Sequence, residues 1–266
     1  MMIPVLKQAA QEAGKILNSY FRTQYKYNYK SLVRKSIVTE ADILSQKKIC
    51  QTIISQLSKT GIKSDDIGFI GEEKLNHLAK INFIVDPLDG TTNFFYGIPF
   101  FCVSIACVRD GVCTDGLIYQ PTNNSFYWAS KNKGAFFESG ENKHQLKVIH
   151  RPLDQCLVDF YFHRQSHSYN NIFKELSLLL PKIYRLRNIG SLALSLSYFT
   201  DNHYGVVINK AARLWDLAAV DLIIQQAGGG LFGSNGKKLI LDYQNNKKTY
   251  SLIACHPDNI DELISK

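Results

Sequence analysis

A short apolar stretch that ends in two closely spaced carboxylates constrains this chain more than any other part of its sequence. Residues 81–85 are mostly apolar and rich in β-branched side chains, which predicts a buried strand. The strand is expected to stop at Asp86-Pro87, because proline has no N–H group with which to continue a ladder. Asp86 and Asp89 then stand three residues apart around a turn that Gly90 relaxes.

These two carboxylates indicate a cation site. By itself, a Pro-Leu-Asp-Gly segment is usually an ordinary surface turn, and that alternative stands beside the functional one. Two close carboxylates repel each other, however, and a shared proton or a bound cation relieves the repulsion. Hard divalent cations such as Mg²⁺ prefer oxygen ligands of this kind. The stretch therefore predicts a metal site at the end of a buried strand.

The composition is that of an ordinary globular enzyme. The chain has 266 residues, 45% of them hydrophobic and 20% charged, which argues against disorder and allows two cooperating halves or one large layered domain. No apolar run approaches the ~18–20 residues of a membrane span and no signal-peptide pattern is present, so we expect a cytoplasmic protein. Six cysteines without a C-x-x-C pair predict reduced thiols. The net charge of +8 favours anionic partners, either phosphorylated small molecules or nucleic acid, although the basic residues are scattered.

An acidic residue also stands at the start of a predicted helix. Apolar residues recur at helical spacing over about residues 3–22. In a second predicted helix, Thr39 is a candidate N-cap with Asp42 three residues later, and Gly61 ends the helix. Asp42 can serve that cap alone or aim its carboxylate at the site, and the two interpretations are compatible.

Two more acidic positions follow the same pattern. Residues 67–73 predict a second strand that ends in Glu72 and Glu73. Adjacent glutamates are normally solvated, but after an apolar strand one of them could turn inward as a ligand. Asp216 precedes a helical run and is an N-cap at face value, and Trp215 beside it is a core anchor at face value.

The chain is expected to divide at about residue 142. Four strand-like segments over 103–138 are separated by short turns, which predicts an antiparallel meander. We therefore expect an α+β subdomain over 1–142 with an antiparallel sheet and most metal ligands. Strand and helix alternate afterwards, which predicts an α/β subdomain over 143–266 that contributes Asp216 and substrate contacts. Residues 239–241 are among its predicted strands.

Together these segments resemble the inositol monophosphatase family, most closely its bacterial SuhB-type members. The similarity covers the whole length and rests on V-T-E-A-D at 38–42, G-E-E at 71–73, D-P-L-D-G-T-T-N-F at 86–94, G-x-P at 97–99, G-S at 190–191 and W-D-L-A-A at 215–219. D-P-L-D-G-T-T together with W-D-x-A at this separation is highly specific. The resemblance implies a layered αβαβα sandwich of the sugar-phosphatase type. It also implies a Mg²⁺-dependent, lithium-sensitive phosphomonoesterase that is usually a homodimer.

The resemblance further implies a metal-binding role for five residues. Glu72, Asp86 and the backbone carbonyl of Leu88 would hold a first ion. Asp86, Asp89 and Asp216 would hold a second, with two or three Mg²⁺ ions per site. One carboxylate shared between two cations is a common way to hold a metal pair.

Other residues are expected to act on the water and the substrate. Thr91, supported by Asp42, would help Glu72 to activate the attacking water. Backbone N–H groups at the start of a helix would bind the phosphate. The residues expected to contact the substrate are Gly90, Thr91, Thr92, Ser191 and Asn209.

Three positions depart from the family's usual acidic residues. Ser36 stands two residues before the V-T, Asn209 seven residues before the W-D aspartate, and Ser195 in the helix after G-S. No predicted metal ligand is lost, so hydrolysis is expected to survive, whereas a preference for inositol phosphate is open. Fructose 1,6-bisphosphate, 3′-phosphoadenosine 5′-phosphate and histidinol phosphate are the alternative substrates.

An alternative of another class is a factor associated with RNA or RNA polymerase, because some SuhB-type proteins are implicated in such complexes. His163 and His167 are four residues apart, but the glutamate of H-E-x-x-H is missing, so we expect surface histidines rather than a zinc site. No G-x-x-x-x-G-K-[ST] motif is present, which argues against an NTPase.

Overall fold

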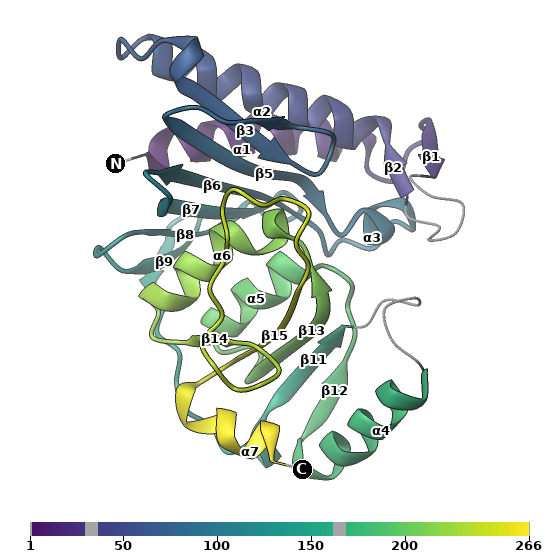
Figure 1. Ribbon diagram of the computed structural model, residues 1–266. Helices are drawn as coiled ribbons and strands as arrows, with labels where there is room; N and C mark the ends of the chain where they lie inside the picture. The colour runs from purple at the N-terminus through teal and green to yellow at the C-terminus, as the bar shows by residue number, and fades with distance from the viewer. Residues whose placement is uncertain (1, 30–36, 162–168, 266) are drawn as a thin grey trace.

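The protein is built of five layers that alternate between helix and sheet (Figure 1). A computed structural model describes residues 2–29, 37–161 and 169–265. Three residues singled out above, Ser36, His163 and His167, lie outside the described residues. The αβαβα sandwich expected from the sequence is confirmed.

The first layer is a pair of long helices, α1 (Ile3–Tyr20) and α2 (Glu40–Ser58). They pack against each other and bury apolar faces against the neighbouring sheet. A short antiparallel ribbon of β1 (Tyr27–Tyr29) and β2 (Ile37–Thr39) leads into α2. Thr39 is the N-cap of α2, as its sequence predicts.

The second layer is a sheet of eight strands in the order β10-β9-β8-β7-β6-β5-β3-β4. Only β3 and β5 pair in parallel; the other neighbours are antiparallel, so the predicted meander is confirmed. The strands in chain order are β3 (Ile67–Gly71), β4 (Asn76–His77), β5 (Ile81–Asp89), β6 (Cys102–Arg109), β7 (Val112–Gln120), β8 (Ser125–Ser130), β9 (Ala135–Ser139) and β10 (Asn142–Gln145).

Two details of this sheet differ from expectation. The strand that was expected to stop at Asp86-Pro87 continues to Asp89, because the ladder accommodates the proline by a register shift between Asp86 and Asp89. The sheet also extends to Gln145, past residue 142, through the β9–β10 hairpin. The division into two subdomains stays a prediction.

The fourth layer is a sheet of five strands in the order β12-β11-β13-β15-β14. β11 is parallel to β12 and β13, and β15 is antiparallel to β13 and β14. The strands are β11 (Leu157–Tyr161), β12 (Arg185–Arg187), β13 (Val206–Ala212), β14 (Gly230–Phe232) and β15 (Tyr250–Cys255). The predicted strand at 239–241 is wrong: this segment forms no strand, and only an isolated bridge at Lys238 precedes it. β14 was missed because its glycine-rich start shows no strand pattern.

Helices fill the space between the two sheets and cover the far side of the second. α5 (Leu192–Thr200) and α6 (Leu214–Gln226) lie between the sheets, and α6 is buried nearly all round, as its apolar sequence requires. α4 (Tyr169–Leu179) and α7 (Ile260–Ile264) cover the outer face, and α3 (Thr91–Phe95) is a single short turn after β5.

Two expectations about chemistry and membranes can be compared with the structure. All six cysteines lie within the described residues and are free, as predicted. Among the described residues, no helix is both long and apolar enough to cross a bilayer.

Candidate metal centre

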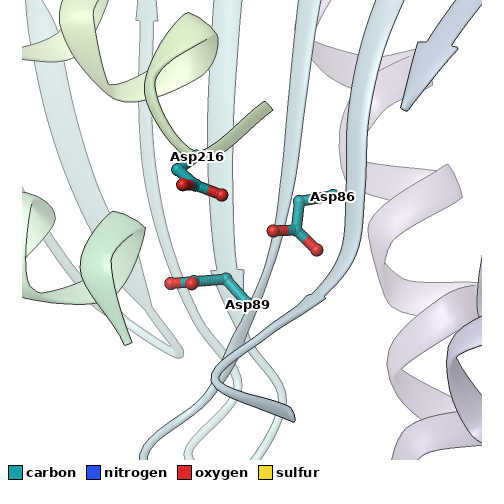
Figure 2. A group of neighbouring side chains, drawn as sticks. All are labelled: Asp86, Asp89 and Asp216. Carbon is teal, nitrogen blue, oxygen red and sulfur yellow. The ribbon is translucent and has the colours of Figure 1, made fainter. Parts of the chain in front are cut away.

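Three aspartates from two distant parts of the chain converge where the first sheet meets α6. Asp86 and Asp89 come from the end of β5, and Asp216 from the start of α6, and Figure 2 shows them around a common space. One carboxylate oxygen from each lies within 4.8 Å of the others. Within the described ranges, this is the only group of three or more His, Cys, Asp or Glu residues that meets this distance.

The register shift at the end of β5 determines how its two aspartates are presented. Asp86 pairs with Ser104 and Asp89 with Cys102 on β6, and the residues between them leave the ladder. The N–H of Leu88 donates to Oδ1 of Asp86 at 3.0 Å, which fixes this buried carboxylate. The irregular end of the strand therefore lets both carboxylates face the site.

Asp89 is held by the start of α5. Its Oδ2 accepts hydrogen bonds from the Ser191 hydroxyl at 2.6 Å and from the Ala193 N–H at 2.8 Å. The first N–H groups of a helix favour an anion at this position. Gly90 follows with φ of 91°, a conformation that favours glycine, and an added Cβ would come within 3.0 Å of Phe100 O and Ser191 Cβ.

Asp216 lies in the first turn of α6. The helix begins at Leu214, so the N-cap expected at Asp216 is wrong; the carboxylate lies two residues further in. Its Oδ2 accepts the Arg213 N–H at 2.7 Å. Ser104 on β6 donates its hydroxyl to the Trp215 carbonyl at 3.2 Å, which ties this turn to the first sheet.

The electrostatics of the cluster favour a cation. Burial, followed by the charges of Glu72, Asp89 and Asp216, raises the pKa of Asp86 well above its usual range. Burial and the charge of Asp89 do the same to the pKa of Asp216. Burial also raises the pKa of Asp89, although Ser191 and the start of α5 oppose the shift. A site made of carboxylate oxygens that repel one another fits a hard divalent cation.

Glu72 lies near the three aspartates without joining the tight group. It follows the last residue of β3 and is half-buried. Its charge contributes to the raised pKa of both Asp86 and Asp216. The structure therefore brings the fourth predicted carboxylate to the edge of the cluster.

Thr91 and Asp42 meet, as the resemblance implies. The Thr91 hydroxyl lies 3.1 Å from Oδ1 of Asp42 and 3.0 Å from the Leu88 carbonyl, and it can donate to one of them at a time. Asp42 is fully buried, and its Oδ2 accepts the Thr39 N–H at 2.8 Å. A carbonyl has two lone pairs, so this contact leaves Leu88 able to bind a cation as well.

The residues expected to contact substrate are placed differently from one another. Thr92 is exposed at the start of α3, whereas Ser191 is buried and gives its hydroxyl to Asp89. Asn209 is buried on β13, and its Oδ1 accepts the Ala211 N–H at 2.8 Å. Ser195 is buried beside Asp159. The pKa of Asp159 is raised by burial, and Ser195 opposes part of this shift.

Sequence reasoning missed Tyr161 as a neighbour of the acidic cluster. Burial, followed by the charges of Asp89 and Asp216, raises the pKa of its phenol, so the ring lies within electrostatic range of these carboxylates. It ends β11 and pairs in register with Asn209 on β13. An aromatic residue in an apolar strand gives no signal that could have identified it.

Comparison with known proteins gives a consistent result. The model of the inositol monophosphatase family matches residues 1–266. An inositol-1-monophosphatase of Mesorhizobium japonicum is 31% identical over 91% of this chain and 88% of its own length. A protein named Nus factor SuhB, from Xylella fastidiosa, is 28% identical over 85% of this chain and 80% of its own length.

A solved structure agrees with these sequence relatives. The extragenic suppressor protein SuhB of Bartonella henselae superposes with a TM-score of 0.84 at 28% identity. The match covers 100% of this chain and 98% of that protein.

Proposed function

The chain belongs to the inositol monophosphatase family, and on that premise we propose that it is a Mg²⁺-dependent phosphomonoesterase acting on a small phosphorylated alcohol. Membership implies phosphatase activity. The observation that carries the proposal is the convergence of Asp86, Asp89 and Asp216 in a buried cluster with raised pKa values. Cations bound there would relieve the repulsion that these carboxylates exert on one another.

The residues divide into two ligand sets. One Mg²⁺ ion would be held by Glu72, Asp86 and the Leu88 carbonyl. A second would be held by Asp86, Asp89 and Asp216. A third Mg²⁺ ion per site is the alternative to two. When bound, such ions supply Lewis acidity toward a phosphate ester and acidify water. We assign Asp86 to both sets because it is the most buried of the three aspartates. The charges of Glu72, Asp89 and Asp216 also all contribute to its raised pKa.

The chain's own polar groups would orient the water and the phosphate. The Thr91 hydroxyl, which lies between Asp42 and the Leu88 carbonyl, would accept a hydrogen bond from the attacking water and so orient it. Glu72 at the edge of the cluster would take that proton. Backbone N–H groups of Gly90, Thr91 and Thr92, at the turn into α3, would bind phosphate oxygens.

The identity of the phosphorylated alcohol depends on residues outside the acidic cluster. Inositol monophosphate is the first candidate, as the family name indicates. Asn209 Oδ1 accepts the Ala211 N–H, so the acidic residue that the family places here is replaced by a neutral amide with one oxygen, already hydrogen-bonded to the main chain. Fructose 1,6-bisphosphate, 3′-phosphoadenosine 5′-phosphate and histidinol phosphate therefore stay as alternatives with the same chemistry.

A substrate panel tests the proposal. Phosphate release is measured for these four compounds with Mg²⁺, with Mg²⁺ plus Li⁺, and with EDTA. We expect release that requires Mg²⁺, falls with Li⁺, and is lost in Asp86→Asn. Full activity of Asp86→Asn, or of the wild type in EDTA, would refute metal-dependent hydrolysis at this site.

A second function of a different class is favoured by the relatives named Nus factor SuhB and by the net charge of +8. The protein would associate with RNA or RNA polymerase, independently of catalysis. Binding to labelled RNA that weakens with salt and persists in Asp86→Asn would support this role. A homodimer is also proposed, and light scattering of the purified protein would test it.

A further inference from the structure

The first turns of α2 bury three polar side chains toward the candidate site. Asp42, Ser45 and Gln46 have exposed fractions of 0%, 0% and 8%. Their spacing of three and four residues places them on one face of the helix. Buried polar groups are costly unless they are hydrogen-bonded, so this face requires partners.

Each of the three side chains has a partner on a different segment of the site. Asp42 accepts from Thr91, as described, and the Ser45 hydroxyl donates to the Pro87 carbonyl at 3.1 Å. Gln46 Nε2 donates to the Glu73 carbonyl at 2.9 Å, and the Glu73 N–H donates to Gln46 Oε1 at 3.3 Å. One helix face therefore contacts the segments that carry Glu72, Asp86 and Thr91.

Gln46 acts on the segment after β3 as a neighbouring strand would. Its amide donates to the main-chain carbonyl and accepts from the main-chain N–H of one residue, Glu73, at the point where the strand has ended. It also packs on the other side of Glu72, because a Cβ added to Gly71 would lie 3.3 Å from Gln46 Oε1 and 2.7 Å from Val85 O. The backbone of Glu72 thus lies between Glu73, which is hydrogen-bonded to Gln46, and Gly71, whose lack of a side chain leaves space for the Gln46 amide.

We infer that Gln46 is a positioning residue for Glu72, within a template formed by Asp42, Ser45 and Gln46 on α2. The inference rests on the proposed phosphatase function. Gln46 is not one of the proposed metal ligands; it fixes the backbone next to Glu72, which is one. Loss of the Gln46 amide is therefore expected to displace Glu72 relative to Asp86, while Asp89 and Asp216 keep their own hydrogen bonds.

The decisive variant is Gln46→Leu, which keeps the size of the side chain and removes both hydrogen bonds. Thr52→Val is the matched control, because Thr52 is a buried polar residue of the same helix with 9% exposure, well beyond the site. Gln46→Glu retains an acceptor for the Glu73 N–H and loses the donor to the carbonyl. Each is assayed by phosphate-release kinetics on the best substrate of the panel and by calorimetric Mn²⁺ binding.

We expect Gln46→Leu to lower kcat and weaken Mn²⁺ binding by about 10- to 100-fold, the usual effect of losing a residue that orients a metal ligand. KM is expected to stay near the wild-type value, Gln46→Glu to be intermediate, and Thr52→Val to match the wild type. If Gln46→Leu does not fold, Gln46→Glu decides by the same measures.

A folded Gln46→Leu with the kcat and Mn²⁺ affinity of Thr52→Val would overturn the inference. A fall in kcat that Thr52→Val shares in equal measure would overturn it too, since the effect would then be general to the helix. If the wild type releases no phosphate, the proposed function fails, and Mn²⁺ binding alone decides: weaker binding in Gln46→Leu supports the positioning role and unchanged binding refutes it.

Discussion

α2 and α6 begin with the same local motif and use it for different ends. Each carries an aspartate three residues after its N-cap, Asp42 and Asp216. In each, one carboxylate oxygen accepts the N–H of the N-cap residue, from Thr39 at 2.8 Å and from Arg213 at 2.7 Å. The two helix starts therefore share this hydrogen bond between the N-cap N–H and the aspartate.

The difference lies in what the second carboxylate oxygen faces. Oδ1 of Asp42 lies 3.1 Å from the Thr91 hydroxyl, a hydrogen-bond donor. Asp216 faces Asp86 and Asp89 instead, and burial and this repulsion raise its pKa. The same cap is therefore part of a satisfied hydrogen-bond network in α2 and part of a cluster of repelling carboxylates that could bind a cation in α6. What lies beyond the helix decides the function of the aspartate.

Catalysis should show the largest difference between the two aspartates. Asp216→Asn removes a proposed metal ligand, so we expect kcat/KM to fall by about 100-fold or more, whereas Asp42→Asn acts only through Thr91 and should cost about 10-fold. Phosphate-release kinetics across a Mg²⁺ titration measures both. Added Mg²⁺ should restore Asp42→Asn more fully than Asp216→Asn, and equal losses in the two variants would break the distinction.

The stability of the metal-free protein should change in opposite directions. Asp216→Asn removes a buried like charge and keeps an acceptor for the Arg213 N–H, so we expect a gain of about 1 kcal/mol in the free energy of unfolding. Asp42→Asn leaves one acceptor oxygen in place of two and turns charge-assisted hydrogen bonds from Thr39 and Thr91 into neutral ones, so we expect a loss of about 1–3 kcal/mol. Urea unfolding in EDTA measures both. A loss of stability in both variants would contradict the repulsion assigned to the cluster.

The pH dependence should sharpen the same contrast. Because the folded-state pKa values of Asp86, Asp89 and Asp216 are raised, the folded protein binds protons more tightly than the unfolded chain. This tighter proton binding stabilises the folded state. The stabilisation is complete below the unfolded-state pKa of about 4 and is lost as pH rises through the folded-state pKa values. In EDTA, the free energy of unfolding of Asp216→Asn should therefore exceed that of the wild type by an amount that grows as pH rises toward neutrality. Urea unfolding across pH tests this, with Mg²⁺-loaded wild type as the control; an advantage that is independent of pH would refute it.

The sequence predicted the helices and strands that carry this site better than the contacts between them. The helix start at Thr39 and the strand before Asp86 were readable because capping residues and β-branched runs act locally. The start of α6 was misplaced, because its N-cap is Arg213, whose side chain makes no capping hydrogen bond and whose residue type does not predict an N-cap. Asp216 was assigned to the N-cap position itself, whereas it lies three residues further on and accepts the Arg213 N–H.

The connections depend on contacts between distant segments. Ser191 and the start of α5 bind Asp89 across about a hundred residues of chain, and Gln46 binds the peptide of Glu73 from another helix. Gln46 in a helix and Tyr161 in a strand look like ordinary members of their elements. Their roles follow only once the sheets and helices are packed together.

The smallest expected effect compares the two N-cap residues themselves. Thr39 uses both its N–H and its hydroxyl with Asp42, the hydroxyl at 2.5 Å from Oδ2. Thr39→Ala should therefore lower the free energy of unfolding by about 1 kcal/mol, the usual value of a lost N-cap side chain. Arg213 uses only its N–H in the cap, and its guanidinium reaches the Lys247 carbonyl on the exposed surface at 2.9 Å, so Arg213→Ala should change stability by less than about 0.5 kcal/mol. Urea unfolding of the two single variants at neutral pH in Mg²⁺ separates these values. An equal loss in Arg213→Ala would mean that the side chain, and not the main chain, holds Asp216 in place.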